Sequence, residues 1–223
     1  MSLKNIVKLK VLIFLCLGAG NLRAFAYDNG DFQIWHTESQ EVGIGKATRL
    51  TQEQEWRFGG YASELYYQHY EWGVVWGFDK RLDIGLNYRQ IYDKYKHKWR
   101  EENRPHANAT VKLDLWGFKF DDRNRIEYRH FRYKNDFIRY RNKFTLKYPF
   151  DFRSIKIAPY TSDEIFISSN ATGFNENRFY SGLELGLTKY VKADIYYLLR
   201  SSKIAGDKWS CVNTLGTKLK ISF

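Results

Sequence analysis

A two-residue repeat of apolar and polar side chains runs through most of this sequence and limits what it can fold into. The repeat is clearest over residues 137–148, where one parity is mainly apolar and the other mainly basic. The apolar parity reads Ile138, Tyr140, Asn142, Phe144, Leu146 and Tyr148, and the opposite parity contains Arg139, Arg141, Lys143 and Lys147. A strand sends alternate side chains to opposite faces, whereas a helix would mix these two sets. The repeat therefore predicts strands with one apolar and one polar face.

Eleven segments carry this pattern, at residues 31–40, 47–58, 67–78, 82–92, 107–118, 124–134, 137–149, 155–167, 178–187, 191–201 and 209–223. Their lengths suit a tilted strand that crosses a bilayer, which needs about 9 to 11 residues. A soluble sandwich would also alternate, but the long strands and the aromatic residues near strand ends favour a membrane barrel. We predict an all-β chain that forms a closed antiparallel transmembrane β-barrel.

The connections between these segments are expected to alternate in length, as they do in outer-membrane barrels. Tight turns are predicted at residues 79–81, 121–124 and 188–190, and long polar loops at 93–104 and 168–177. The apolar parity shifts near His130, which predicts a β-bulge. Because bacterial single-chain barrels have even strand numbers, we prefer twelve strands, with ten as the alternative.

Both ends of the chain carry export signals. Three lysines precede an apolar stretch over residues 11–20, which is followed by Ala24-Phe25-Ala26. This order is typical of a cleaved signal peptide, so we predict a signal peptide at residues 1–26 and one barrel domain at 27–223. The last strand ends in Phe223, which resembles an assembly signal for the bacterial outer membrane. The expected partners are outer-membrane lipid and, through this strand, the barrel assembly machinery.

The composition argues against a nucleic-acid partner and against an internal disulfide. The first 26 residues contain four basic and no acidic residues, so the net charge falls from +11 for the whole chain to +7 for the remainder. The bases are spaced along strands instead of clustering in a tail, and an exported protein rarely meets nucleic acid, so a nucleic-acid partner is not expected. Cys211 is the only cysteine after residue 26, which excludes an internal disulfide in that part of the chain.

The polar parity predicts what fills the barrel. Arginine and lysine near the middle of a bilayer cost about 2–4 kcal/mol each when they face lipid, so these side chains must face the interior. The basic residues expected on neighbouring inner faces are Arg125, Arg129, Arg139, Arg141, Lys143 and Lys147. A water-filled interior of this kind would favour small anions. The alternative is a structural or adhesive barrel that is plugged by charges paired with one another.

No residue pattern indicates catalysis, a metal or a cofactor. The five histidines lie outside any Gly-x-Ser-x-Gly sequence, and none has metal-ligand spacing. We therefore expect no enzymatic activity, no catalytic residues, no metal and no cofactor. A lipid-modifying enzyme of the outer membrane is the distant alternative, because such enzymes activate a hydroxyl nucleophile with a histidine on the barrel wall.

The order of several short segments resembles the family of outer-membrane barrels known as domain of unknown function 2490. The matching segments are 31–35, 53–58, 87–89, 159–160, 163–166, 177–178 and 180–187. This resemblance covers nearly all of residues 27–223 and implies the same fold and location without implying an activity. The chain is also similar in size and basic pattern to oligogalacturonate-specific porins, a likeness of architecture alone.

Overall fold

The computed structural model describes residues 30–96, 98–153, 155–171, 173–204 and 208–223. The predicted signal peptide lies outside these residues. Within them, twelve strands form, and no helix is long and apolar enough to cross a membrane. The strands are β1 (Phe32–Gly43), β2 (Thr48–Gly59), β3 (Glu64–Gly77), β4 (Leu82–Tyr95), β5 (Lys98–Leu115), β6 (Phe118–Phe131), β7 (Phe137–Lys147), β8 (Phe150–Phe152), β9 (Ile155–Ser168), β10 (Phe174–Gly186), β11 (Val191–Lys203) and β12 (Trp209–Ser222).

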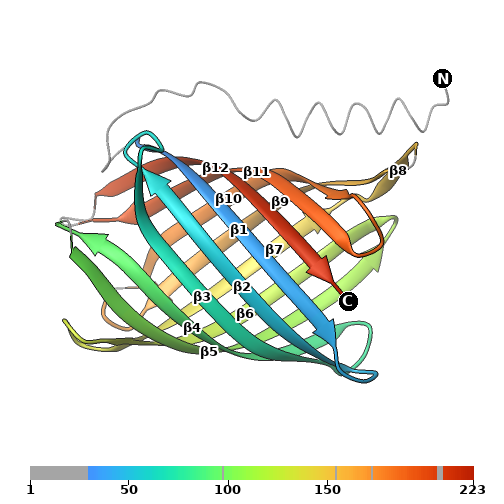
Figure 1. Ribbon diagram of the computed structural model, residues 1–223, viewed down its shortest axis with the longest axis horizontal. Coiled ribbons are helices and arrows are strands. Elements are labelled where there is room, and N and C mark those ends of the chain that lie inside the picture. The colour runs from blue at the N-terminus through green and yellow to red at the C-terminus, as the bar shows by residue number, and fades with distance from the viewer. Residues whose placement is uncertain (1–29, 97, 154, 172, 205–207) are drawn as a thin grey trace.

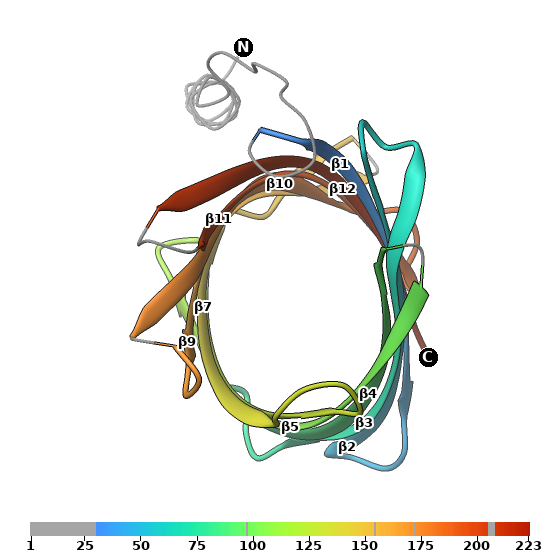
Figure 2. The same cartoon turned by 90° about the vertical axis from the view of Figure 1, so that its left-hand side faces the viewer.

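Eleven of these strands pair in a closed ring. The view along the barrel shows this closed wall (Figure 2). Consecutive strands pair around the ring, β7 pairs with β9, and β12 returns to β1. The short strand β8 pairs with β9 and stands outside the ring at one end (Figure 1). The predicted closed barrel of about twelve strands is therefore confirmed, with eleven strands in the wall itself.

The ring closes through a parallel pair, whereas every other neighbouring pair in the wall is antiparallel. β1 and β12 lie in register from Phe32 opposite Asn213 to Glu41 opposite Ser222. An odd number of strands requires one such pair, because strand direction cannot alternate all the way around an odd ring. The eleven segments predicted from the periodicity correspond one to one to the wall strands, and the parallel seam removes the need for a twelfth.

Four local predictions are wrong. Residues 168–177 do not form one long loop, because Ser168 ends β9 and residues 174–177 begin β10. Residues 93–95 end β4 and residues 98–104 begin β5 instead of forming a long loop, with Asp93 opposite Arg100. The tight turn between β5 and β6 lies at Trp116 and Gly117, which both have positive φ, whereas residues 121–124 belong to β6. β6 keeps one register with β5 through His130 to Phe131, and one register with β7 up to Arg129, so there is no bulge at His130. The register shifts that do occur lie at Arg57/Phe58 and Phe174/Glu176.

The two ends of the barrel differ. Phe223 lies at the end that also carries the turn at residues 116–117, and we call this the C-terminal end. The first residues of β1 lie at the opposite end, with the turns at 60–63 and 132–136. At the C-terminal end the backbone N–H of Phe223 donates to the carbonyl of Glu41 (2.9 Å), and its ring stacks on Tyr190.

The parallel seam can be tested by cross-linking. In a Cys211→Ala background, Ile34→Cys with Leu215→Cys should form a disulfide in the folded barrel, because these residues are Cα partners across the seam. Neighbouring strands lie about 4.8 Å apart, within disulfide reach. The measurement is the gel mobility of the oxidised, folded protein with and without reductant.

The control pair is Ile34→Cys with Leu219→Cys, which is displaced by four residues, or about 13 Å along the strand. Cross-linking of the control pair in preference to the first would contradict the register and the eleven-strand wall.

Candidate functional site

Alternate residues of the wall strands face the interior, and the structure places the six predicted basic residues there. Arg125, Arg141, Lys143 and Lys147 line a cavity of about 400 Å³ in the middle of the barrel. Arg129 and Arg139 line a second cavity of about 260 Å³ toward the opposite end. A third cavity, of about 550 Å³, lies at the C-terminal end.

Most of these six bases are paired with acids. Glu127 accepts hydrogen bonds from Arg139 (2.7 Å) and Arg141 (2.8 Å), and Arg125 lies 3.6 Å from the same carboxylate. Arg104 lies 3.9 Å from it as well, so four guanidinium groups surround this fully buried carboxylate and strongly stabilise its ionised form. Glu127 therefore anchors half of the predicted basic row.

The other three bases differ in their partners. Arg129 binds both carboxylate oxygens of Glu102 at 2.7 Å, and Lys147 binds Glu184 at 3.0 Å. Lys143 pairs with no acid in the part of the chain that the structure describes. Its ammonium instead lies 3.7 Å from the centre of the Tyr180 ring. Lys143 is thus the member of the row whose charge is least compensated.

Four arginines separate the middle cavity from the cavity toward the opposite end, because they line both. We call this set the arginine layer; it consists of Arg57, Arg89, Arg141 and Arg178. Each member has a carboxylate partner. The partners are Glu55 for Arg57, Glu71 and Glu53 for Arg89, Glu127 and Glu164 for Arg141, and Glu176 for Arg178.

Two buried aromatic rings support the arginine layer from inside the barrel. The guanidinium carbon of Arg57 lies 3.6 Å from the centre of the Trp35 ring. Arg141 and Arg178 each lie 4.6 Å from the centre of the Phe166 ring. Stacking on a ring face holds a guanidinium plane in one orientation and adds attraction when water is excluded. The layer is therefore fixed by rings as well as by acids.

The sequence interpretation did not single out these rings or Arg57 as members of a site. Trp35 and Phe166 lie on the inward parity of apolar-looking segments, where an aromatic side chain suggests lipid contact. Arg57 shares the parity of Glu53 and Glu55. That two-residue spacing is the signal that could have placed Arg57 in the interior.

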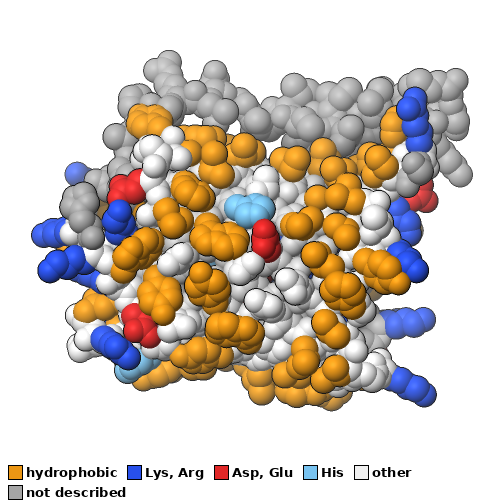
Figure 3. Space-filling model, in the orientation of Figure 1, with side chains coloured by type: hydrophobic (Ala, Val, Ile, Leu, Met, Phe, Trp, Pro, Cys, Tyr) orange, Lys and Arg blue, Asp and Glu red, His pale blue; other side chains and the backbone are white. Residues whose placement is uncertain are grey.

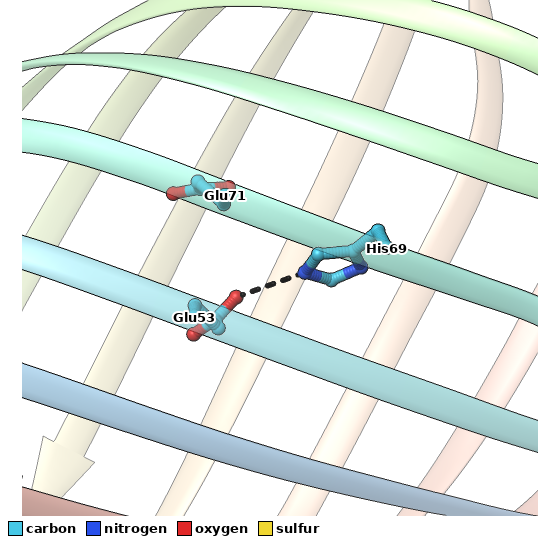
Figure 4. Close-up of side chains that lie close together, drawn as sticks. All are labelled: Glu53, His69 and Glu71. Atoms are coloured by element: carbon cyan, nitrogen blue, oxygen red, sulfur yellow. Dashed lines mark ion pairs between the residues drawn. The ribbon is translucent and has the colours of Figure 1, made fainter.

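A cluster of Glu53, His69 and Glu71 has its ligand atoms within 4.8 Å of one another (Figure 4). Two cations already occupy its surroundings, since Lys218 lies 2.7 Å from Glu53 and Arg89 binds both acids. A divalent cation would have to displace them or add two further charges to a balanced group. The cluster therefore fits a structural role, with His69 between Glu53 at 3.4 Å and the Tyr67 hydroxyl at 3.2 Å.

A second histidine lies on the outer face of the barrel, beside the seam. The ring of His36 contacts the Thr217 hydroxyl at 2.8 Å and Glu38 at 3.4 Å, and Gln54 donates to Glu38 at 2.8 Å. The face of the barrel drawn in Figure 3 is mainly apolar between its two ends. A hydroxyl on a histidine could serve acyl transfer, but the backbone N–H groups here belong to the sheet ladder and cannot form an oxyanion hole. The polar side chains around His36 therefore serve as hydrogen-bond partners for one another.

One rim turn is held by an exposed acid. Asp136 accepts hydrogen bonds from His130 (2.8 Å), the Tyr128 hydroxyl (2.5 Å) and the backbone N–H of Phe131 (2.9 Å). These donors, the His130 ring first among them, lower the pKa of Asp136 to about 2. The turn at residues 132–136 is thereby fixed at the opposite end of the barrel.

The importance of Glu127 can be measured directly. Glu127→Gln takes the buried carboxylate from Arg139 and leaves Arg141 with Glu164 alone, so the free energy of unfolding should fall by about 3–5 kcal/mol. The measurement is urea-induced unfolding in detergent, followed by heat-modifiable gel mobility.

The control is Asp114→Asn, which removes an exposed pair with Lys119 whose side chains are 70% and 51% exposed. That change should cost no more than about 1 kcal/mol. Equal effects of the two substitutions would show that the interior network is no stronger than a surface pair.

The model of one protein family, described as a protein of unknown function (DUF2490), matches residues 32–210. The matched stretch runs from the first residue of β1 into β12 and so includes nearly the whole wall. This match confirms the resemblance indicated by the ordered segments. No curated protein matches the chain.

Proposed function

The chain belongs to the family of proteins of unknown function DUF2490, and we propose that it is an outer-membrane channel that favours small anions. The proposed location is supported by the large apolar side chains that the barrel exposes on its outer face, among them Leu86, Val111, Ile126, Ile138 and Ile195. Such residues are costly in water and suited to lipid. Outer-membrane lipid is thus a proposed partner, as is the assembly machinery that would act on the strand ending in Phe223.

The composition of the middle cavity carries the channel proposal. Ten basic and seven acidic side chains line it. Acids outside this lining also pair with its bases, namely Glu127, Glu176 and Glu41. Over all three cavities together, seventeen basic and twelve acidic side chains line the interior, so positive charge remains in excess there after Glu127 is added. Basic side chains around a hydrated passage select anions, and Lys143 lines this passage without an ion-pair partner among the described residues. Passage toward the opposite end would run through the arginine layer.

A structural barrel with a plugged interior is the second candidate. It is favoured by one observation, that every member of the arginine layer already has a carboxylate partner. In that case the charges hold the wall strands together and no solute passes. No enzymatic reaction is part of either proposal.

Bilayer recordings distinguish the two candidates. The purified chain in a planar bilayer should conduct, and its reversal potential in a salt gradient should show anion preference. Lys143→Glu replaces the unpaired positive charge with a negative one and should shift the reversal potential toward cations. A silent bilayer that contains folded protein would favour the plugged barrel.

The matched control is Lys119→Glu, which makes the same change of charge at an exposed rim position. It should leave the reversal potential nearly unchanged. Equal shifts from both substitutions would assign selectivity to the overall field, and no shift from Lys143→Glu would remove the middle cavity as its source.

A further inference from the structure

We propose that the cavity toward the opposite end is a binding site for a small oxyanion with at least two negative charges, of the diphosphate or tricarboxylate kind. This inference rests on the proposed function, because it assigns a ligand class to the interior that the channel would use. The cavity measures about 260 Å³, which accommodates such an ion with some of its water. We call it the arginine vestibule.

The lining of the arginine vestibule is unusually rich in guanidinium groups. Nine basic and three acidic side chains line it. The bases are Arg57, Arg89, Lys94, Arg104, Arg129, Arg139, Arg141, Arg178 and Arg200, and the acids are Asp93, Glu102 and Glu176. Guanidinium groups present paired N–H donors that match the oxygens of phosphate and carboxylate groups. The chemistry of the wall therefore fits an oxyanion.

Two of the acids are each shared by two arginines. Glu102 binds Arg104 at 2.6 Å and Arg129 at 2.7 Å. One carboxylate carries one charge, so one of these two guanidinium charges is in excess. The same arrangement occurs at Glu176, which binds Arg178 at 2.7 Å and Arg200 at 3.1 Å. At each of these two carboxylates, one arginine can therefore move away while the other still pairs with the acid.

Exposure identifies which arginine of each pair can turn to a ligand. The side chain of Arg129 is 17% exposed against 6% for Arg104, and that of Arg200 is 28% exposed against 9% for Arg178. Arg104 and Arg178 would keep their carboxylates, while Arg129 and Arg200 turn toward the anion. No buried acid loses its last partner in this exchange, which keeps its electrostatic cost low.

The two movable arginines approach from well-separated parts of the wall. Arg129 comes from β6 and Arg200 from β11, and on either path around the ring several strands lie between them. An anion with two separated charged groups can meet both, whereas a monovalent anion can meet one. The geometry therefore favours multivalent over monovalent oxyanions. Asp93 also lines the cavity and opposes any anion that approaches its carboxylate.

The test is calorimetric titration of the folded full chain in neutral detergent at low ionic strength with pyrophosphate, citrate and acetate. Pyrophosphate or citrate should bind saturably at one site, and acetate should bind at least about tenfold more weakly. Comparing the two multivalent ions distinguishes a phosphate from a polycarboxylate ligand. Acetate binding as tight as both, or no saturable binding by either, would overturn the proposal.

Arg129→Gln with Arg200→Gln should weaken binding of the multivalent anion at least about tenfold per arginine, because each substitution removes a charged hydrogen-bond donor. Lys112→Gln with Lys220→Gln removes the same charge from the cavity at the C-terminal end and is the matched control. Binding that survives the first pair of substitutions, or falls equally in the control, would contradict the site.

Arg129→Lys with Arg200→Lys keeps the charge and removes the paired N–H donors of each guanidinium group. It should therefore restore part of the affinity for the multivalent anion if the barrel of the glutamine variant is intact.

Bilayer recordings on the same samples separate this proposal from the channel. Conductance without saturable pyrophosphate or citrate binding would remove the vestibule site and leave the channel. Saturable binding by a barrel that never conducts would leave the site and remove the channel.

Discussion

The interior of this barrel depends on carboxylates that several basic side chains share. Glu127 on β6 meets arginines of β6 and β7, and Glu164 on β9 meets Arg141 on β7 and Arg123 on β6. The same kind of contact crosses the seam, because Lys218 on β12 reaches over β1 to Glu53 on β2 at 2.7 Å. Ion pairs thus join strands that the backbone ladder does not pair directly, and they hold the odd ring closed.

This arrangement is an expensive way to fill a barrel. Burying a charge costs several kcal/mol, and well-packed apolar side chains often stabilise a protein more than a buried ion pair does. Here the wall keeps most of its apolar residues outside and encloses three cavities among paired charges. An excess of bases over acids remains after the pairing. We infer that the interior is arranged to hold water and anions as well as to hold the strands together.

Much of the fold could be predicted because alternation survives wherever one face is apolar. The prediction from alternation failed where both faces of a strand are polar. In the hairpin of β4 and β5, Glu101 and Asn103 face outward while Glu102 and Arg104 face inward. This sequence therefore resembled a polar loop. Asp121 and Asp122 likewise lie on opposite faces of β6 and imitated a turn. The parallel seam was missed although eleven segments were found, because the even strand numbers of bacterial barrels favoured twelve strands.

The candidate site, too, could be predicted only in part from the sequence. Parity alone could assign the basic row to one face, since that requires only a strand. It could not predict that Glu127 pairs with four arginines while Lys143 has no acid partner among the described residues, because those contacts depend on the register between strands. The rings of Trp35 and Phe166 were missed because an inward aromatic residue in a barrel strand has the same spacing as an outward one.

The central claim is that the enclosed positive charge holds anions in the middle of the barrel. Crystals of the protein soaked in bromide and, separately, in rubidium salt test it most directly, through the anomalous scattering of each ion. We expect bromide peaks in the middle cavity beside Lys143 and no rubidium there. Rubidium in that cavity, or neither ion in it, would contradict the account.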